Sequence, residues 1–257
     1  MDDATKTCPD CGQAVKADAI LCRHCKYDFK AGRPAAAVDD GPPPRRSSSA
    51  PIIIVIVLVA GGGLVAFIAI IAAIAIPGLL ASQRASNERN AAASLKTICV
   101  ADVDFRSNDR DANKINDFWT GDVAGLYCMT AADVKGNRDE MMKLIEISVA
   151  GADFAPLPDG AAGGEYASID RVTPRAPKAG YHFAALQLNT EGKPYHDGSL
   201  RNPVEFGFCA FPQAKAAGRS VFIISEGNTI FRRQADLSPL RQWPTDDELR
   251  MSWSKLD

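Results

Sequence analysis

Four of the seven cysteines lie in the first 25 residues and form two C-x2-C pairs, Cys8 with Cys11 and Cys22 with Cys25. Each short pair can direct two thiolates at one ion, and four thiolates complete the tetrahedral shell that structural zinc prefers. The alternatives are a disulfide pair or a redox-active C-x-x-C. Two pairs separated by ten residues, with no βαβ pattern around them, favour zinc. We therefore predict a structural Zn²⁺ site with these four cysteines as ligands.

His24 lies inside the second cysteine pair, and we expect it to be a spectator because the four thiolates already complete the set. The charges around the cysteines alternate in sign, and the whole chain carries a net charge of −2. A nucleic-acid reader would present a basic face of one sign. We therefore expect no nucleic-acid partner, and expect this module to contact protein or to act as a structural cap.

Conventional catalytic side chains are few after the cysteine module. His182 stands between Tyr181 and Phe183 in a predicted strand, where a packed histidine is expected, and His196-Asp197 falls in a polar turn. The sequence has no nucleophile elbow, no P-loop and no further pair at metal-ligand spacing. We predict that the protein is not an enzyme, with no catalytic and no cofactor-binding residue.

The other three cysteines, Cys99, Cys128 and Cys209, are scattered. Cys99 could form one disulfide with Cys128 or with Cys209 if this part of the chain faces an oxidising compartment. Buried free thiols are the other interpretation, and the sequence leaves both open.

An apolar run must hold these parts at a membrane. Residues 52–76 contain only Ile, Val, Leu, Ala, Gly and Phe, and as a helix they reach about 37 Å, which spans a bilayer. The run begins some fifty residues into the chain, behind a cysteine module and a proline-rich spacer, unlike a cleavable signal peptide. We predict a retained transmembrane helix with the lipid bilayer as its partner.

The predicted domain organisation follows from these features. A zinc ribbon covers 1–30, a disordered Pro/Ser-rich linker 31–51, the transmembrane helix 52–76, an amphipathic extension 77–106 and an α+β domain 107–257. Arg45 and Arg46 in the linker would lie at the level of lipid headgroups.

The last domain should pack an antiparallel sheet on the long helix. We predict a loop-rich connection over 106–130, a helix over 138–149 and a long irregular stretch over 150–180. Four strands are then predicted, over 181–188, 204–211, 220–225 and 229–234. Glu226-Gly227-Asn228 predicts a hairpin between the last two strands. Because the strands follow one another without crossover helices, we expect an antiparallel meander and an α+β fold.

The stretch from Thr7 to Phe29 resembles the short zinc ribbons found at the ends of many bacterial proteins. In that family a glycine usually follows the last cysteine, whereas this chain has Lys26. That position eases a tight turn, so the difference predicts a slightly strained turn around an intact site.

Residues 69–98 are similar to the N-terminal helix of type IV pilins and pseudopilins, and parts of 175–231 with Trp243-Pro244 resemble the sheet of pilin-like envelope proteins. The resemblance implies a helix kinked at Pro77 whose outer half packs on an antiparallel sheet. The expected packing face consists of residues at helical spacing: Ala85, Ala92, Leu95, Cys99 and Val103. The processing motif is absent, and Ala60 stands where the family has glutamate, so filament assembly is not expected.

The sequence says least about the orientation of the protein in the membrane and about its role. Three basic residues flank the span closely on each side, so the positive-inside count is a tie. Zinc thiolates favour a reducing compartment. We expect a single-pass protein of the bacterial inner membrane with a cytoplasmic N-terminus and an extracytoplasmic pilin-like domain. It would serve as a structural, interaction or signalling component with protein partners on one or both sides. The alternatives are a type IV pilus or secretion-system pseudopilin subunit and, third, an envelope enzyme using His182 or His196.

Overall fold

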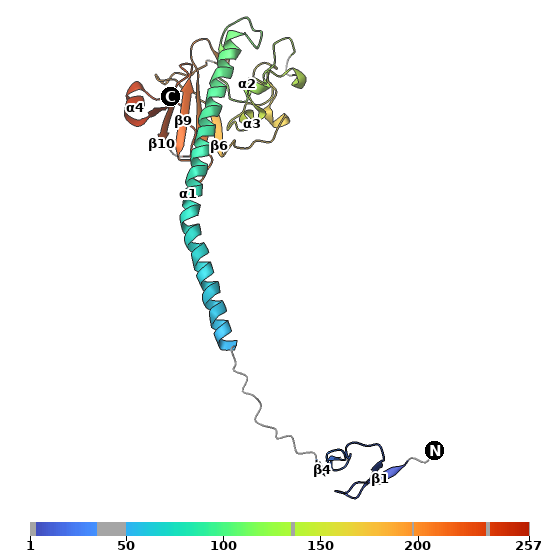
Figure 1. The fold of residues 1–257 in the computed structure, drawn as a ribbon. Coiled ribbons are helices and arrows are strands. Elements are labelled where there is room, and N and C mark those ends of the chain that lie inside the picture. Colours follow the sequence, from blue (N-terminus) through green and yellow to red (C-terminus); the bar gives the residue numbers. More distant parts are fainter. Residues whose placement is uncertain (1–3, 35–49, 135–136, 197, 235–236, 257) are drawn as a thin grey trace. The chain divides into compact units, whose positions relative to one another are not determined.

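The computed structural model describes residues 4–34, 50–134, 137–196, 198–234 and 237–256, and in the long helix it describes side chains from residue 69 onward. The chain divides into two compact units, Met1–Val65 and Ala66–Asp257 (Figure 1). The first contains the cysteine module, and the second contains an α+β domain. Most of the predicted linker, including Arg45 and Arg46, lies outside the described residues.

The cysteine module is built from two short antiparallel strand pairs. Strand β1 (Thr5–Thr7) pairs with β2 (Ala14–Lys16), and β3 (Tyr27–Asp28) pairs with β4 (Arg33–Pro34). Strand β4 lies in the stretch that we predicted as linker. Each pair places two cysteines in the turn that follows β1 or precedes β3, so the strands position the thiols.

Helix α1 (Ala50–Ser107) is 58 residues long and covers both the predicted transmembrane helix and its extension. It continues through Pro77 without interruption. From Ala69 to Ser107 it is long and apolar enough, by length and composition, to cross a membrane. Large apolar side chains on its first described turns are exposed, and Ile74 is 74% and Leu79 is 70% exposed.

The main sheet has five antiparallel strands in the order β11-β10-β9-β8-β6. The strands are β6 (Tyr181–Ala185), β8 (Gly207–Pro212), β9 (Ser220–Ser225), β10 (Ile230–Gln234) and β11 (Ser254–Leu256). The four predicted strands and the meander are confirmed, and Asn228, with φ of +52°, closes the predicted hairpin. Strand β11 was not predicted, because three residues give no readable alternation.

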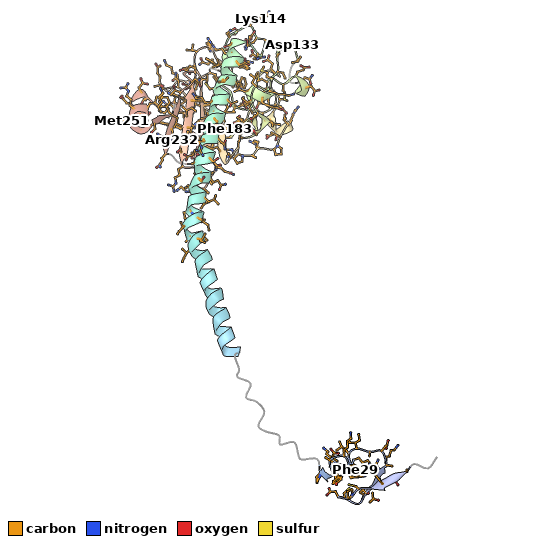
Figure 2. All side chains as sticks on the ribbon, viewed as in Figure 1. Phe29, Lys114, Asp133, Phe183, Arg232 and Met251 are labelled. Atoms are coloured by element: carbon orange, nitrogen blue, oxygen red, sulfur yellow. The ribbon has the colours of Figure 1, made fainter. Side chains whose placement is uncertain are left out.

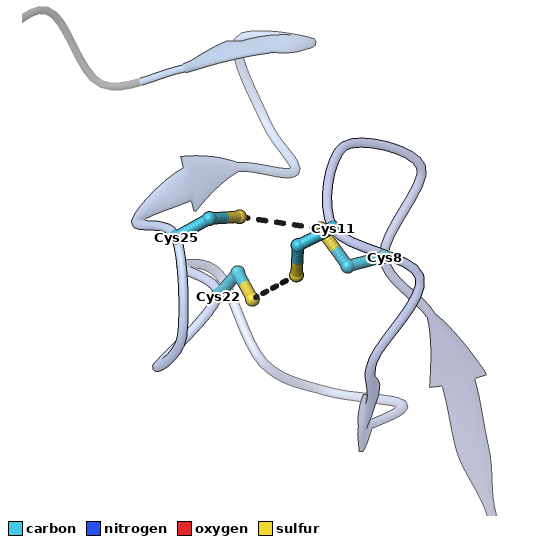
Figure 3. A group of neighbouring side chains, drawn as sticks. All are labelled: Cys8, Cys11, Cys22 and Cys25. Atoms are coloured by element: carbon cyan, nitrogen blue, oxygen red, sulfur yellow. Dashed lines mark hydrogen bonds between the residues drawn. The ribbon is translucent and has the colours of Figure 1, made fainter.

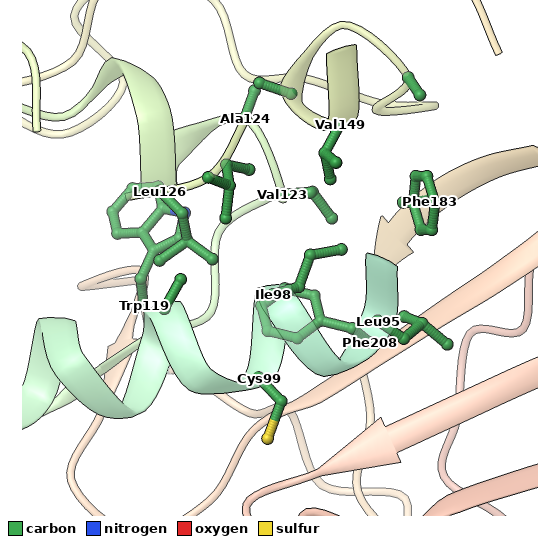
Figure 4. Close-up of a cluster of buried hydrophobic side chains, with 14 of the residues drawn as sticks. Leu95, Ile98, Cys99, Trp119, Val123, Ala124, Leu126, Val149, Phe183 and Phe208 are labelled. Atoms are coloured by element: carbon green, nitrogen blue, oxygen red, sulfur yellow. The ribbon is translucent and has the colours of Figure 1, made fainter. Parts of the chain in front are cut away.

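Each face of this sheet has its own covering layer. Helix α1 covers one face, where Leu95 and Ile98 lie in one buried cluster with Phe183 and Phe208 (Figure 4). The other face carries Phe211, Val221 and Ile223, together with Trp253 after α4 (Asp246–Ser252). Helix α4 begins with a capping box between Thr245 and Glu248. Alternate residues of the strands therefore enter two separate apolar layers.

The predicted packing face of α1 is partly confirmed. Leu95 and Cys99 are buried, and Ala92 is half-buried. Ala85 and Val103, which we also placed on this face, are exposed. Val103 is turned outward because its neighbour Asp102 points inward and accepts a hydrogen bond from the Trp119 N–H.

The segment between α1 and the sheet is irregular, as predicted. Its regular pieces are short: β5 (Phe118–Trp119), which pairs with β7 (Arg201–Asn202), α2 (Gly125–Cys128), η1 (Arg138–Glu140), α3 (Ile147–Ala150) and η2 (Ile169–Arg171). The predicted helix over 138–149 is wrong. The N–H groups of Met142 and Leu144 donate to the carbonyls of Met129 and Leu126, so this backbone runs alongside α2 instead of bonding within itself.

Candidate metal centre

The first cysteine pair lies in a tight turn directly after β1. The Cys8 N–H donates to the Gln13 carbonyl at 3.0 Å, and the Gly12 N–H donates to the Cys8 carbonyl at 2.9 Å. Gly12 has φ of +68°, a left-handed conformation that costs glycine nothing. This turn directs the Cys8 and Cys11 thiols to the same side.

The second cysteine pair repeats this arrangement. The Cys22 N–H donates to the Tyr27 carbonyl, and the Lys26 N–H donates to the Cys22 carbonyl, both at 2.8 Å. Lys26 therefore occupies the position of Gly12, and its φ is +56°. The left-handed backbone confirms the strained turn predicted at Lys26.

The two turns bring four sulfur atoms together (Figure 3). The Sγ atoms of Cys8 and Cys25 are 3.6 Å apart, those of Cys11 and Cys22 are 3.7 Å apart, and all four lie within 4.8 Å of one another. A tetrahedron of sulfurs at the usual zinc–sulfur distance has edges of about 3.8 Å. A disulfide would need about 2.05 Å. The four thiols can therefore bind one metal ion.

Backbone donors favour the thiolate form at one of these positions. The N–H of Cys25, followed by that of His24, lowers the pKa of Cys22 to about 7. Burial raises the pKa of Cys25. Because metal ions bind the deprotonated thiol, binding would release the protons that the raised pKa retains.

Little else stabilises this module. Its buried apolar set is Val15 with the cysteines, and Tyr27 and Phe29 pack edge to face at 5.5 Å beside it. The Lys6 ammonium lies 4.2 Å from the centre of the Phe29 ring. A core of this size rarely supports a fold alone, so we expect the fold of this module to depend on a metal ion held by the four thiols.

His24 lies outside the sulfur cluster. Its side chain is exposed, and its Nε2 accepts a hydrogen bond from Arg23 Nε at 3.2 Å. The cluster that could hold an ion in the described chain consists of the four cysteines only.

His182 is packed between aromatic rings. Its ring centre is 5.9 Å from that of Phe154 and 5.8 Å from that of Phe211. Its Nδ1 is buried without a hydrogen-bond partner among the described residues. Among the described residues, no carboxylate or hydroxyl group forms a hydrogen bond with this ring.

His196 lines a cavity of about 450 Å³ together with Thr120, Asp122 and Asp153. Asp197, its neighbour in the predicted turn, lies outside the described residues. The two carboxylates of this cavity are committed to structural hydrogen bonds. From the sequence we placed His196 in a polar turn and did not predict that its side chain lines a cavity.

Asp122 and Asp153 organise the irregular segment. Asp122 accepts hydrogen bonds from the Trp119 indole at 3.0 Å, the Gly125 N–H at 2.8 Å and the Tyr166 hydroxyl at 2.6 Å. Asp153 accepts three backbone N–H groups, two of them at the start of α2. Burial and then the neighbouring Asp122 carboxylate raise the pKa of Asp153 to about 8.

The three cysteines of the second unit are buried free thiols. Burial raises the pKa of Cys99 to about 11 and those of Cys128 and Cys209 to about 12. Cys99 and Cys128 belong to the layer between α1 and the sheet, whereas Cys209 belongs to the opposite face. Of the two open interpretations, the structure has the free thiols.

Comparisons with protein-family models, with curated proteins and with solved structures found no match for this chain.

Proposed function

We propose that this chain is a single-pass membrane protein whose N-terminal ribbon holds one zinc ion and whose pilin-like C-terminal domain is held at the membrane surface by α1. It would act as a structural, interaction or signalling component of a bacterial envelope. No group of side chains described above supports catalysis, so we propose no enzymatic activity.

The observation that carries the proposal is the change in surroundings along α1. The large side chains exposed before the domain are apolar: Ile70, Ile71, Ile74, Ile76, Leu79 and Leu80. At about 100° per residue they point to all sides of the helix. From Arg84 onward the same helix forms hydrogen bonds with the domain, and from Ala91 onward it contributes to the domain's core. Apolar side chains on every side suit lipid as the solvent, because in water they would form a large exposed patch.

Zinc is the proposed ion because of the ligand chemistry. Four thiolates are soft donors that favour Zn²⁺ over Mg²⁺ or Ca²⁺, and a complete set leaves no open position for a substrate. The site would therefore be structural. Zinc thiolates persist in a reducing compartment, which supports a cytoplasmic ribbon and an extracytoplasmic domain at the inner membrane.

A second candidate is a type IV pilus or pseudopilus subunit. A long N-terminal helix whose second half packs on an antiparallel meander supports it. The absent processing motif and Ala60 oppose it, because a neighbouring subunit's amino terminus would find no buried carboxylate.

The test is an intact-mass measurement on protein that stays in membranes after an alkaline carbonate wash. A mass of 27.5 kDa with one zinc per chain would support the anchored protein. A mass lacking the residues before Ile56 would favour the pilus subunit. Release of the protein into the carbonate wash would overturn the membrane anchor.

A further inference from the structure

We propose that the end of the C-terminal domain nearest the apolar half of α1 binds the phosphate headgroups of anionic phospholipids. The surface consists of five basic residues, here called the basic collar: Arg84, Arg89, Lys215, Arg219 and Arg232. This inference rests on the membrane anchoring proposed above and adds a lipid class to it.

The loop between β8 and β9 is fixed to α1 where the helix enters the domain. Arg84 Nε donates to the Ala216 carbonyl at 3.4 Å, and Asn87 Nδ2 donates to the Ala217 carbonyl at 2.9 Å. The Arg219 N–H donates to Glu88 Oε1 at 3.0 Å. Three successive contacts therefore hold residues 213–219 beside this part of the helix.

The same loop is packed tightly against the sheet. A Cβ on Gly218 would lie 2.0 Å from the Tyr181 hydroxyl, so the backbone approaches this side chain as closely as only glycine allows. The Gly218 N–H and the Ala217 N–H both bond back to Ala214. The loop is thus held in one shape before any ligand arrives.

The helix sets the height of the loop above the membrane. Leu80 is the last large apolar side chain exposed before the domain. Arg84 follows it by four residues, a rise of about 6 Å, and Glu88 by eight, a rise of about 12 Å. A headgroup layer is about 5–8 Å thick. The loop that contacts 84–88 therefore lies at or just above the headgroups once the apolar half of α1 is in a bilayer.

The exposed side chains of the domain at the level of the headgroups are mainly positively charged. Lys215, Arg219, Arg89 and Arg232 are exposed, Arg84 is half-buried, and none of the five makes an ion pair within the described chain. Arg232 is exposed on β10, on the same face of the strand as the buried Ile230 (Figure 2). It lines a groove of about 360 Å³ with Arg219, Ser220 and Glu88.

Two acidic side chains near the collar have partners within the domain. Glu88 accepts the Arg219 backbone N–H, and Glu146 pairs with Lys178 at 2.7 Å. The other end of the sheet differs in sign, since the loop before β8 carries Glu205 and the β9–β10 turn carries Glu226. Lys96 there is bonded to the Asn228 side chain at 3.1 Å. We therefore place the anionic surface at the end of the domain near the membrane level.

The test uses the full-length, zinc-loaded protein in nanodiscs of phosphatidylcholine alone or with one third phosphatidylglycerol. Hydrogen–deuterium exchange of the amides in 213–219 is the readout. We expect exchange to slow by about fivefold when the anionic lipid is present, because each basic group near such a surface is attracted to it. Lys215→Glu and Arg219→Glu should each remove most of this difference.

Lys114→Glu is the matched control, because Lys114 is exposed at the end of the domain opposite the apolar half of α1 (Figure 2). It should keep the lipid-dependent protection. Equal exchange in both lipids would overturn the proposal and leave the collar as a surface for an acidic protein partner. Flotation with vesicles tests the membrane anchor separately from the basic collar. Protein that floats with either lipid but shows no lipid-dependent protection retains the anchor and loses the collar, whereas protein that floats with neither loses both.

Discussion

The Asp102 carboxylate on α1 accepts the backbone N–H of Trp119 at 2.8 Å, and both residues are fully buried. Its second oxygen has no hydrogen-bond partner in the described part of the chain. Burial, and to a lesser degree the Asp117 carboxylate, raises the pKa of Asp102 well above its usual value, although the Trp119 N–H opposes this. The long helix is thus joined to β5 through a carboxyl group that resists ionisation.

Asp102→Asn should stabilise the domain at neutral and higher pH. With a raised folded-state pKa, the folded chain binds a proton that the unfolded chain releases above about pH 4, so the free energy of unfolding falls as pH rises. Asparagine keeps an acceptor for the Trp119 N–H and removes the titration. We expect a gain of at least about 1 kcal/mol at pH 8 and little change at pH 4. Urea unfolding followed by tryptophan fluorescence measures this, since all three tryptophans lie in the C-terminal domain.

Asp104→Asn is the control for this experiment. Asp104 lies on the same helix, but it is partly exposed and pairs with Arg110 at 2.9 Å. Its loss should cost under about 1 kcal/mol. A gain from Asp102→Asn that is the same at pH 4 and pH 8 would show that the carboxyl group does not titrate as its burial requires.

Arg201→Met should be strongly destabilising. Arg201 on β7 bonds to Asp111 at 2.6 Å and to Glu165 at 2.9 Å, and the Asp111 side chain is only 1% exposed. Without the guanidinium, a buried carboxylate loses its cation, which costs about 3–5 kcal/mol. The same urea experiment measures the loss.

Arg110→Met removes a comparable pair at the surface, where the two side chains are 45% and 33% exposed. We expect a cost under about 1 kcal/mol from that change. If both arginine variants unfold at the same urea concentration, the cluster around Arg201 contributes no more than a surface ion pair.

Regular elements could be predicted where local pattern and packing agree. The strand over 220–225 matches β9 residue for residue, because a run of Val, Phe and Ile ends at a clear turn sequence. The prediction of a helix over 138–149 was wrong because the local pattern suited a helix, whereas the backbone N–H groups of this stretch form hydrogen bonds with the carbonyls in and next to α2. Those carbonyls accept hydrogen bonds from residues 142–144, and no local pattern in the sequence predicts this pairing.

The candidate site was predictable because its chemistry is local in sequence. Two C-x2-C pairs determine where four thiols point once each turn forms. The carboxylates of Asp122 and Asp153 could not be found this way, since their donors include Tyr166 and the N–H of Val123, 44 and 30 residues away. An aspartate in a loop gives no indication of partners so distant along the chain.

Cys11→Ser should remove zinc, and His24→Ala should not. Serine cannot replace a thiolate in the four-sulfur set, whereas His24 is exposed and bonds only to Arg23 in the described chain. After dialysis against a weak chelator, we expect one zinc per chain in the native protein and in His24→Ala, and almost none in Cys11→Ser. Metal analysis of the detergent-solubilised protein gives the count.

Far-ultraviolet circular dichroism and tryptophan fluorescence distinguish a variant that has lost its ion from one whose C-terminal domain has unfolded. Tryptophan fluorescence should be unchanged in Cys11→Ser, because the second unit carries its own core. Equal zinc loss from both variants would contradict the spectator role of His24 and make it a fifth contributor to the site.

Lys26→Gly should strengthen zinc binding, and Gly12→Ala should weaken it. The two residues occupy equivalent positions in the two turns, with φ of +56° and +68°. A non-glycine residue pays about 1 kcal/mol for this left-handed backbone. A Cβ at Gly12 would meet no atom within 4 Å, so Gly12→Ala tests the backbone alone. If folding of this module is coupled to zinc binding, as proposed above, the strain changes the zinc affinity by about fivefold in each direction. Competition with a chromophoric chelator measures both constants, and a change of the same sign in the two variants would mean that the equivalence of the turns does not govern the site.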